Sequence, residues 1–489
     1  MSLIHLRPIT DPTLTGDAVA DERVRLDHAG FRAAVRAAAE ELARHGIDRG
    51  DVVAVVLPNR VELVVTMYAA WLLGAAVTPV NPALTEDEVC YQLTDAGARL
   101  AVVDAASREL VGGVAAIDAE QVLAASGGST AEPLVAARAD DLALLIYTSG
   151  TTGRPKGVRL DHANLSAMTT ALQTELRFTA DDRALLVLPL FHVNAIMLSV
   201  VTPLAAGGSA MILAKFDPRT FWTVVETERP SYFSAVPAIY VFLSALPEDV
   251  RPDTTSLRFA VCGAAPMPPS AIIDFETRYN VPITEGYGLS ESTVALTVNP
   301  LDGPRKAGTV GRPLPGIEVA IAADDGTLLP SGVDGEVVAR GATIMRGYLA
   351  KPEETAAALR NGWLHTGDVG HLDEDGYLVL VDRKKELIIR GGENISPSEV
   401  EAVLATHPAV LEVAVVGRPD PVMGEEPVAF VVARAGQVID PADVLETART
   451  VLAKFKVPKE VRVVNSLPRN AVGKIVKAPL RDMLTAGGQ

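Results

Sequence analysis

Two hydrophobic periodicities alternate through residues 1–110, and this alternation constrains the fold more than any other feature of the chain. Apolar side chains recur at helical spacing in residues 31–45 and 62–73, and Thr85 with Glu88 forms the capping-box pattern that begins a helix. Continuous apolar runs of strand length lie between these segments, at residues 52–57, 75–80 and 100–103. Repeated strand–helix–strand units predict a parallel sheet with helices on both faces.

The pattern changes further along the chain. Residues 142–298 repeat the strand–helix texture, whereas residues 311–381 alternate short strands with Asp-Gly turns, which predicts a small antiparallel β region. After residue 382 the pattern predicts helices at 398–406 and 440–454, and strands at 413–416 and 428–432. We therefore expect an α/β fold: a large N-terminal domain (1–384) of layered, mainly parallel sheets plus a small β region, then a small mobile α+β C-terminal domain (385–489).

The composition argues against several classes of protein. Lys and Arg number 44 against 61 Asp and Glu, and a net charge of −17 disfavours nucleic acid or an anionic membrane as the main partner. The longest nearly apolar stretch, residues 63–77, is shorter than the about 20 residues of a membrane-spanning helix. Cys90 and Cys262 belong to no CxxC pair, and residues 1–11 carry no signal-peptide pattern. We expect a cytoplasmic protein without a membrane span.

The strongest local motif is the string YTSGTTGRPKG at residues 147–157, directly after an apolar strand at 142–146. Its glycines allow a close approach of the backbone to a ligand, and its hydroxyls and lysine suit phosphate oxygens. The string is not a Walker A loop, because Lys156 lies between Pro155 and Gly157. The residues expected to hold phosphate are Thr148, Ser149, Gly150, Thr151, Thr152, Gly153 and Lys156.

This string resembles the signature loop of the adenylate-forming superfamily, which includes acyl-CoA synthetases, peptide adenylation domains and luciferases. Further family-like segments follow in order: LPLFHVN at 188–194, GAAP at 263–266, TEGYGLSES at 284–292, WLHTGD at 363–368, DRKKE at 382–386, GGENISP at 391–397 and PRNAVGK at 468–474. The order is more specific than any single motif. The resemblance to the acyl-CoA synthetase branch implies an acid–thiol ligase that uses ATP, Mg²⁺ and CoA.

The resemblance also implies where the nucleotide binds. Tyr287 would stack on adenine, Asp368 would accept hydrogen bonds from the ribose hydroxyls, and Arg383 would meet the ribose or phosphates. Glu291 and Thr148 would hold Mg²⁺, a cation that prefers oxygen ligands. The other implied nucleotide-binding residues are Gly263, Ala264, Ala265, Glu285, Gly286, Gly288 and Ser290.

Three further roles come from the resemblance. Lys474 would be the catalytic lysine that contacts the carboxylate and the α-phosphate, with Glu291 and His192 completing the catalytic set. Lys385 would be the hinge about which the C-terminal domain turns between the two half-reactions. The residues implied to line the CoA channel are Gly391, Gly392 and Glu393.

The acyl pocket is implied to comprise His192, Val193, Asn194, Ser234, Val236, Gly288 and Leu289. His192 would orient the acid or gate the pocket, although a satisfied structural histidine is the alternative. Amino-acid-activating relatives typically carry Asp at this position, so an amino-acid substrate is disfavoured. The contributing segments, residues 191–198, 234–240, 259–265 and 288–297, hold no charged residue except Glu291. A second carboxylate would be buried without a partner there, so we expect an apolar fatty, alicyclic or aromatic acid.

Other interpretations stay open at this point. The acyl group could pass to the phosphopantetheine arm of an acyl carrier protein instead of CoA, or the acid could be a dicarboxylate of the malonyl type. A nucleotide-binding protein without catalysis is a third class, which the presence of both Lys474 and Glu291 disfavours. The sequence is compatible with a monomer or a homodimer.

Overall fold

The computed structural model describes residues 3–124, 137–148, 155–265, 267–383, 386–390, 393–469 and 475–485. They fall into two compact units, Met1–Val319 with Ala339–His365 and Ala320–Val338 with Thr366–Gln489. The expected boundary between residues 384 and 385, like most of the surface loop expected at 124–138, lies outside the described ranges. None of the helices described is both long enough and apolar enough to cross a bilayer.

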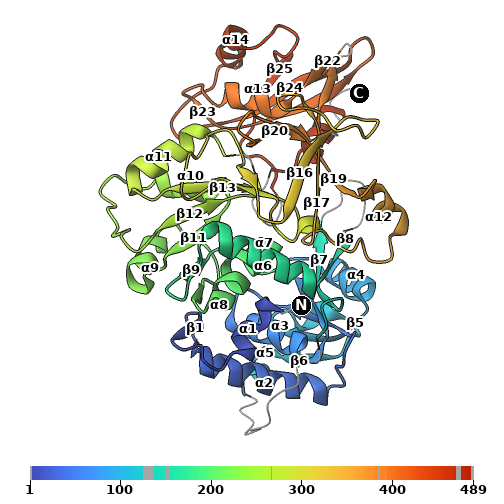
Figure 1. The fold of residues 1–489 in the computed structure, drawn as a ribbon. Coiled ribbons are helices and arrows are strands. Elements are labelled where there is room, and N and C mark those ends of the chain that lie inside the picture. The colour runs from blue at the N-terminus through green and yellow to red at the C-terminus, as the bar shows by residue number, and fades with distance from the viewer. Residues whose placement is uncertain are drawn as a thin grey trace. The chain divides into compact units, whose positions relative to one another are not determined.

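A six-stranded sheet in the first unit confirms the predicted alternation of strands and helices (Figure 1). Its order is β6 (Ala116–Asp118), β5 (Ala98–Val103), β3 (Val52–Val56), β4 (Ala76–Val80), β7 (Leu142–Thr148) and β8 (Lys156–Asp161). The strands from β6 to β7 are parallel, but β8 runs antiparallel to β7, which the sequence did not predict. Strand β3 is an unbroken run of Val and Ala because both of its faces are buried.

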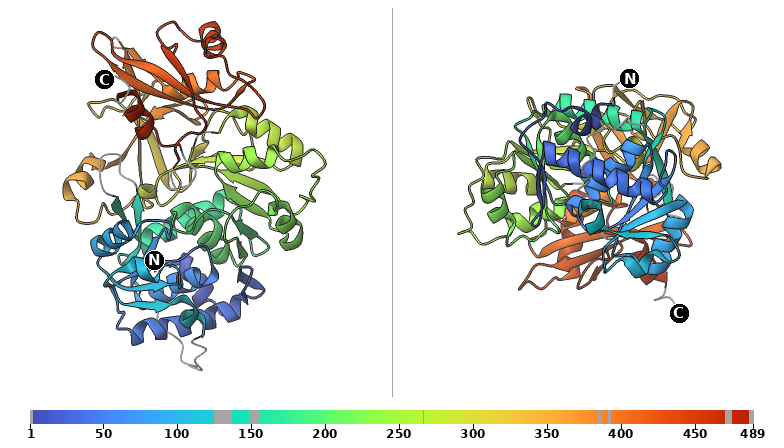
Figure 2. Two further views of the ribbon diagram at one scale, coloured as in Figure 1. Left: turned by 180° about the vertical axis from the view of Figure 1, so that it is seen from behind. Right: turned by 90° about the horizontal axis from the view of Figure 1, so that it is seen from below.

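Helices cover both faces of this sheet. The layer on one face consists of α2 (His28–Arg44), α3 (Val61–Leu73) and α5 (Ala119–Ala124), and the view from below shows α2 outermost (Figure 2). Helix α4 (Glu86–Ala96) packs Val89 and Leu93 on the other face, above the short η2 (Arg108–Val111). Helix α4 begins at the predicted capping box, where the Glu88 carboxylate accepts from the Thr85 N–H at 2.8 Å.

A nine-stranded sheet completes the first unit. Its order is β15 (Arg312–Pro313), β14 (Thr297–Val298), β13 (Ile283–Tyr287), β12 (Phe259–Cys262), β11 (Tyr232–Ala235), β9 (Arg183–Leu186), β10 (Ser209–Ile212), β1 (Asp17–Ala20) and β2 (Arg25–Asp27). The strands from β13 to β1 are parallel, so their carboxyl ends meet at one edge. The associated helices are η1 (Ile4–Leu6), α1 (Arg7–Thr10), α6 (His162–Leu176), α7 (Val193–Ile196), η3 (Met197–Val201), α8 (Thr202–Ala206), α9 (Phe221–Glu228), α10 (Pro237–Ser244) and α11 (Pro269–Tyr279).

The predicted small β region and α+β unit are both present. The first holds β16 (Ile317–Ala322), β17 (Gly335–Gly341), β18 (Leu359–Arg360), β19 (Trp363–Leu372), β20 (Leu378–Arg383) and an unpredicted helix, α12 (Pro352–Ala358). The second holds β21 (Ile388–Arg390), β22 (Glu393–Ile395), α13 (Pro397–Leu404), β23 (Val410–Asp420), β24 (Gly424–Ala433), α14 (Pro441–Val451), β25 (Glu460–Val463) and α15 (Ala478–Thr485). Strands β23 and β24 carry two apolar clusters, one on each face of their sheet.

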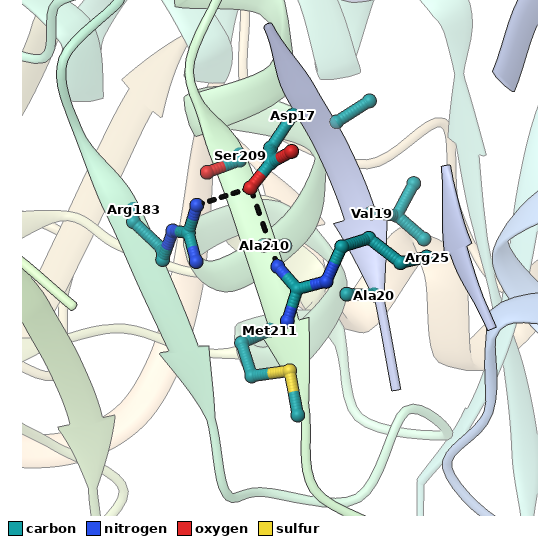
Figure 3. A pocket seen from close by; sticks show the side chains of 9 residues that line it. Asp17, Val19, Ala20, Arg25, Arg183, Ser209, Ala210 and Met211 are labelled. Atoms are coloured by element: carbon teal, nitrogen blue, oxygen red, sulfur yellow. Dashed lines mark hydrogen bonds and ion pairs between the residues drawn. The ribbon is translucent and has the colours of Figure 1, made fainter. Parts of the chain in front are cut away.

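Ion pairs close a small hollow where β1, β2, β9 and β10 meet (Figure 3). The Asp17 carboxylate lies between the guanidinium groups of Arg25 and Arg183, and both arginines also reach Glu228. These charges satisfy one another across the sheet edge. The hollow therefore secures strand ends and offers no free charge to a ligand.

A buried pair of histidines joins the N-terminal segment to the helix that follows the phosphate-loop hairpin. His5 Nε2 lies 2.8 Å from His162 Nδ1, and His5 Nδ1 lies 2.8 Å from Ser166 Oγ on α6. Trp71 packs edge-on against both imidazoles. Burial lowers the pKa of His162 to about 4 and holds the pKa of His5 well below its usual value. Both rings are therefore neutral at pH 7.

We predict that this pair makes stability fall in weak acid. The folded pKa of each histidine is below its unfolded value, so the unfolded chain binds protons first as the pH falls below about 6.5. For His162 alone, the shift from 6.5 to about 4 corresponds to about 3 kcal/mol of stability lost across that window. Thermal unfolding at pH 7.5, 6 and 5 should show a steep fall in Tm.

The matched variants are His162→Gln and His371→Gln, the latter at a partly exposed histidine paired with Asp334. His162→Gln should lower Tm at pH 7.5 but flatten its decline toward pH 5, whereas His371→Gln should keep the wild-type slope. Equal slopes in all three proteins would show that other groups control acid unfolding.

Candidate active site

The phosphate loop predicted at 147–157 joins two antiparallel strands. Thr148 at the end of β7 pairs with Lys156 at the start of β8, and a Cβ at Gly157 would lie 2.9 Å from Leu145 Cδ1. Glycine therefore leaves room for the Leu145 side chain where the two strands pair. The structure brings Thr148 and Lys156 together at the base of the loop. The predicted phosphate residues Ser149, Gly150, Thr151, Thr152 and Gly153 lie outside the described ranges.

Residues 342–349, which we call the strap, run along the free edge of β8. The Arg159 N–H donates to Gly347 at 3.0 Å, and the Leu349 N–H donates to Gly157 at 2.8 Å. Asn164 on α6 donates its amide to the carbonyls of Ala342 and Ile344, at 2.8 and 2.9 Å. These bonds attach a segment almost 200 positions later to the hairpin that carries the phosphate loop.

The strap also fixes the turn that carries Glu291, η4 (Ser290–Ser292). The Met345 N–H donates to the Glu291 carbonyl at 2.8 Å, and the Tyr348 hydroxyl donates to Glu291 Oε1 at 2.8 Å. Lys156 Nζ lies 5.2 Å from the centroid of the Tyr348 ring, within cation–π range. Burial, with Glu291 nearby, raises the pKa of Tyr348 well above its ordinary value, so its hydroxyl remains a donor.

The carboxylate of Glu291 and the hydroxyl of Thr148 are oxygen donors of the kind that Mg²⁺ prefers. Magnesium normally takes only one or two protein carboxylates and completes its shell with water and phosphate oxygens. Among the described residues, no group of three His, Cys, Asp or Glu side chains forms a closed metal cage. This donor set fits a magnesium ion shared with a nucleotide and does not fit a structural metal.

The carboxyl edge of the nine-stranded sheet gathers the predicted acyl and nucleotide residues. Ser234 at the end of β11 donates to Asn194 Oδ1 at 3.0 Å, so β11 and α7 are joined there. A Cβ at Gly263 would lie 3.4 Å from the Gly286 carbonyl and 3.9 Å from Asn194 Nδ2. The open end of a parallel sheet is where α/β proteins bind ligands. The structure thus brings four predicted residues together at the carboxyl edge of this sheet: Asn194, Ser234, Gly263 and Gly286.

The backbone after β13 turns too tightly for side chains at some positions. A Cβ at Gly288 would lie 2.2 Å from the Val294 carbonyl oxygen, so only glycine fits. Ala264, after β12, has a φ of 68°, a left-handed conformation that is uncommon outside glycine. Strain of this kind concentrates at ligand sites. The other predicted residues in these turns are Ala265, Tyr287, Leu289 and Ser290.

Two titratable side chains at this edge have shifted pKa values. Burial raises the pKa of Glu285, in the middle of β13 beside Cys262, to about 7. Burial lowers the pKa of His192 to about 4, and its Nε2 is buried without a hydrogen-bond partner in the described chain. His192 is therefore neutral at pH 7. The centroid of its ring lies 4.5 Å from that of the Phe191 ring, and the predicted pocket residue Val193 follows it in the sequence. Val236 precedes α10 and is half-buried.

The other predicted site residues belong to the second unit. Asp368 on β19 is opposite Arg383 on β20, and Asp368 is 6% exposed. Glu393 is exposed on β22. Lys385, Gly391, Gly392 and Lys474 lie outside the described ranges.

The chain on either side of 470–474 is firmly held. Arg469 and Ile475 form an antiparallel bridge, and Lys477 Nζ lies 2.8 Å from Glu401 Oε1 on α13. Burial raises the pKa of Glu401, and Lys477 opposes that shift. The same lysine lies 3.8 Å from Glu386, directly after the predicted hinge.

Sequence reasoning missed Tyr348 and Lys477. Tyr348 belongs to none of the family-like strings, and its importance depends on pairing with β8, so only the structure identifies it. Lys477 is three positions beyond Lys474, and a basic residue so close to the predicted catalytic lysine was an available signal.

Comparisons with known proteins agree with this geometry. The chain matches the AMP-binding enzyme family over residues 11–349 and the AMP-binding enzyme C-terminal domain over residues 399–474. It is 35% identical to the long-chain-fatty-acid–CoA ligase FadD13 of Mycobacterium tuberculosis, with 99% of this chain and 98% of the relative covered. It is 37% identical to a feruloyl-CoA synthase from Amycolatopsis sp, with 95% of each covered.

Among solved structures, ATP-bound MatB from Rhodopseudomonas palustris superposes with a TM-score of 0.93 at 32% identity, with 100% of both chains covered. The similarity in sequence and the similarity in fold therefore both extend over nearly the whole chain. The protein belongs to the AMP-binding enzyme family and is an acyl-CoA synthetase of the adenylate-forming superfamily.

Proposed function

We propose that this protein activates an apolar carboxylic acid with Mg²⁺ and ATP to an acyl-adenylate, and then transfers the acyl group to CoA. The observation that carries the proposal is the arrangement of Lys156, Tyr348 and Glu291, which puts a cation and a metal-type carboxylate beside the phosphate-loop hairpin. Two anionic substrates must meet in the first step, so neutralising their charge is the main task of the site.

In the first half-reaction a carboxylate oxygen attacks the α-phosphorus of ATP. The bond to the oxygen that bridges to the β-phosphate breaks, and pyrophosphate leaves. Lys156 and the loop hydroxyls bind the departing phosphates, and Lys474 holds the carboxylate against the α-phosphate. Bound Mg²⁺ would add Lewis-acid charge stabilisation at the phosphate oxygens. The protein supplies position and charge and forms no covalent bond to the substrate.

In the second half-reaction a thiol attacks the acyl carbonyl, and AMP leaves with the electrons of the broken acyl–phosphate bond. Lys474 must withdraw to admit the thiol, so we infer that residues 385–489 turn about Lys385. Gly391, Gly392 and Glu393 then line the pantetheine channel. A free thiol is the simplest acceptor, and a carrier-protein arm presents the same group.

Three observations support an apolar acid. The four predicted pocket segments, residues 191–198, 234–240, 259–265 and 288–297, contain no charged residue other than Glu291, and His192 is neutral because burial lowers its pKa to about 4. A second carboxylate would therefore find no cation in these segments. The relatives include a long-chain-fatty-acid–CoA ligase and a feruloyl-CoA synthase. An oxalate–CoA ligase of Arabidopsis thaliana, 36% identical, keeps a dicarboxylate as the second candidate.

We also propose that the enzyme acts in the cytoplasm, as a monomer or a homodimer. Its two cysteines are both unpaired, and Cys262 is buried, which suits a reducing compartment.

The decisive test is pyrophosphate release from Mg-ATP with a panel of aromatic, alicyclic, fatty and dicarboxylic acids, each with and without CoA. We expect release that requires an apolar acid and increases with CoA. Lys474→Ala should slow it at least about 100-fold, because a charged contact made in the transition state is lost. The matched control is Lys454→Ala, an exposed lysine of the same unit, which should keep wild-type activity.

The alternative outcomes identify the competing functions. Release that is indifferent to CoA but stimulated by a phosphopantetheinylated carrier protein would make this a carrier-protein loader. Turnover of malonate or oxalate alone would replace the apolar acid with a dicarboxylate. Absence of release with every acid would contradict the proposed function.

A second test concerns the hinge. Lys385→Pro restricts φ at the position that must change conformation, so we expect pyrophosphate release to persist while thioester formation from supplied acyl-AMP and CoA falls at least about tenfold. Lys385→Ala removes the side chain but leaves the backbone free, and it should retain both half-reactions. Equal losses of both half-reactions in the proline variant would remove Lys385 as the hinge.

A further inference from the structure

One side chain touches both charged groups at the phosphate-loop hairpin. The Tyr348 hydroxyl donates to Glu291 Oε1 at 2.8 Å, and the face of its ring lies 5.2 Å from Lys156 Nζ. Tyr348 thereby links Lys156 at the start of β8 to Glu291 in the η4 turn. The aromatic ring thus stands between the cation and the carboxylate predicted to act on the same triphosphate.

The backbone of Tyr348 is held on two sides. Its neighbours Gly347 and Leu349 both bond to β8, at 3.0 and 2.8 Å, and its own N–H donates to Thr355 Oγ1 at 2.9 Å. A Cβ at Gly347 would lie 2.5 Å from the Thr355 methyl carbon, so glycine lets α12 approach. A side chain on so firmly fixed a backbone can hold its partners in a defined position.

We propose that Tyr348 is a positioning residue for Mg·ATP: its hydroxyl orients the Glu291 carboxylate toward the metal, and its ring holds Lys156 in place at the start of β8. This inference deepens the proposed function and rests on it. With Oε1 accepting from the hydroxyl, Oε2 is the oxygen that Glu291 would offer to the metal. The ring meanwhile separates the Lys156 ammonium from the Glu291 carboxylate. A direct ion pair between them would make both groups less available to the phosphates and the metal.

A space-filling role is the competing explanation, and substitutions separate the two. Phenylalanine retains the ring under Lys156 and loses only the bond to Glu291, whereas leucine loses both. A residue that merely filled space would tolerate phenylalanine.

The experiment is calorimetric binding of ATP, without any acid, across a range of Mg²⁺ concentrations and in EDTA. Tyr348→Phe should increase the Mg²⁺ concentration that half-saturates ATP binding about tenfold, because a hydrogen bond to a charged group is lost, and should leave binding in EDTA unchanged. Tyr348→Leu should weaken binding in both conditions.

The matched control is Tyr279→Phe, which removes a 2.5 Å hydrogen bond from a tyrosine of α11 to the Leu243 carbonyl and not to Glu291. It should leave the Mg²⁺ dependence at the wild-type value. The inference is overturned if Tyr348→Phe binds Mg·ATP like the wild type, or if it loses affinity equally with Mg²⁺ and in EDTA.

Failure of this inference is distinguishable from failure of the proposed function. Wild-type enzyme that releases pyrophosphate normally while Tyr348→Phe keeps its Mg²⁺ dependence contradicts only the role of Tyr348. Tyr348-dependent Mg·ATP binding in a protein that activates no acid contradicts only the proposed reaction.

Discussion

Strand β8 is paired along both edges, and the arrangement of Lys156 and Glu291 depends on that double pairing. On one side β7 closes the hairpin of the phosphate loop, and on the other the strap of residues 342–349 adds a second set of backbone bonds. The strap continues to the carbonyl of Glu291 and, through Tyr348, to its carboxylate. The strap, which is remote in sequence, thereby decides where the Glu291 carboxylate lies relative to β8. Loop-closure entropy opposes such a contact, so the many bonds of the strap are what keep the site assembled.

Local signals in the sequence predicted most of the fold. Helix α3, strand β3 and the capping box at Thr85 follow from periodicity and turn chemistry that depend on neighbouring residues alone. The antiparallel direction of β8 could not be predicted in this way, because the side chains of its sequence KGVRLD alternate between the two faces in the same way whichever direction the strand runs. Helix α12 was missed because it buries no residue and therefore carries no amphipathic signal.

The candidate site also has features that the sequence predicted and features that only the structure shows. Thr148, Lys156 and Glu291 were predicted because they lie in strings that resemble a family, and the structure brings these three into one region through the hairpin and the strap. Tyr348 has no such string, and its contacts depend on which strand edge the strap occupies. The depressed pKa of His192 likewise follows from burial and not from its neighbours in sequence. Sequence therefore supplies the chemistry of the groups, while their protonation and mutual orientation come from long-range packing.

The second unit adds a constraint on how the hinge can work. Asp382, before the predicted hinge at Lys385, accepts bonds from the Ser396 hydroxyl and the Ser398 N–H, at 3.0 and 2.9 Å, and both serines follow the hinge. A turn about Lys385 alone must break both bonds. Each is worth about 1.5–3 kcal/mol net, because the acceptor is a carboxylate. Ligand binding can supply a difference of that size. The two bonds therefore bias the chain toward the present arrangement of α13 without locking it, as the proposed turn between the two half-reactions would require.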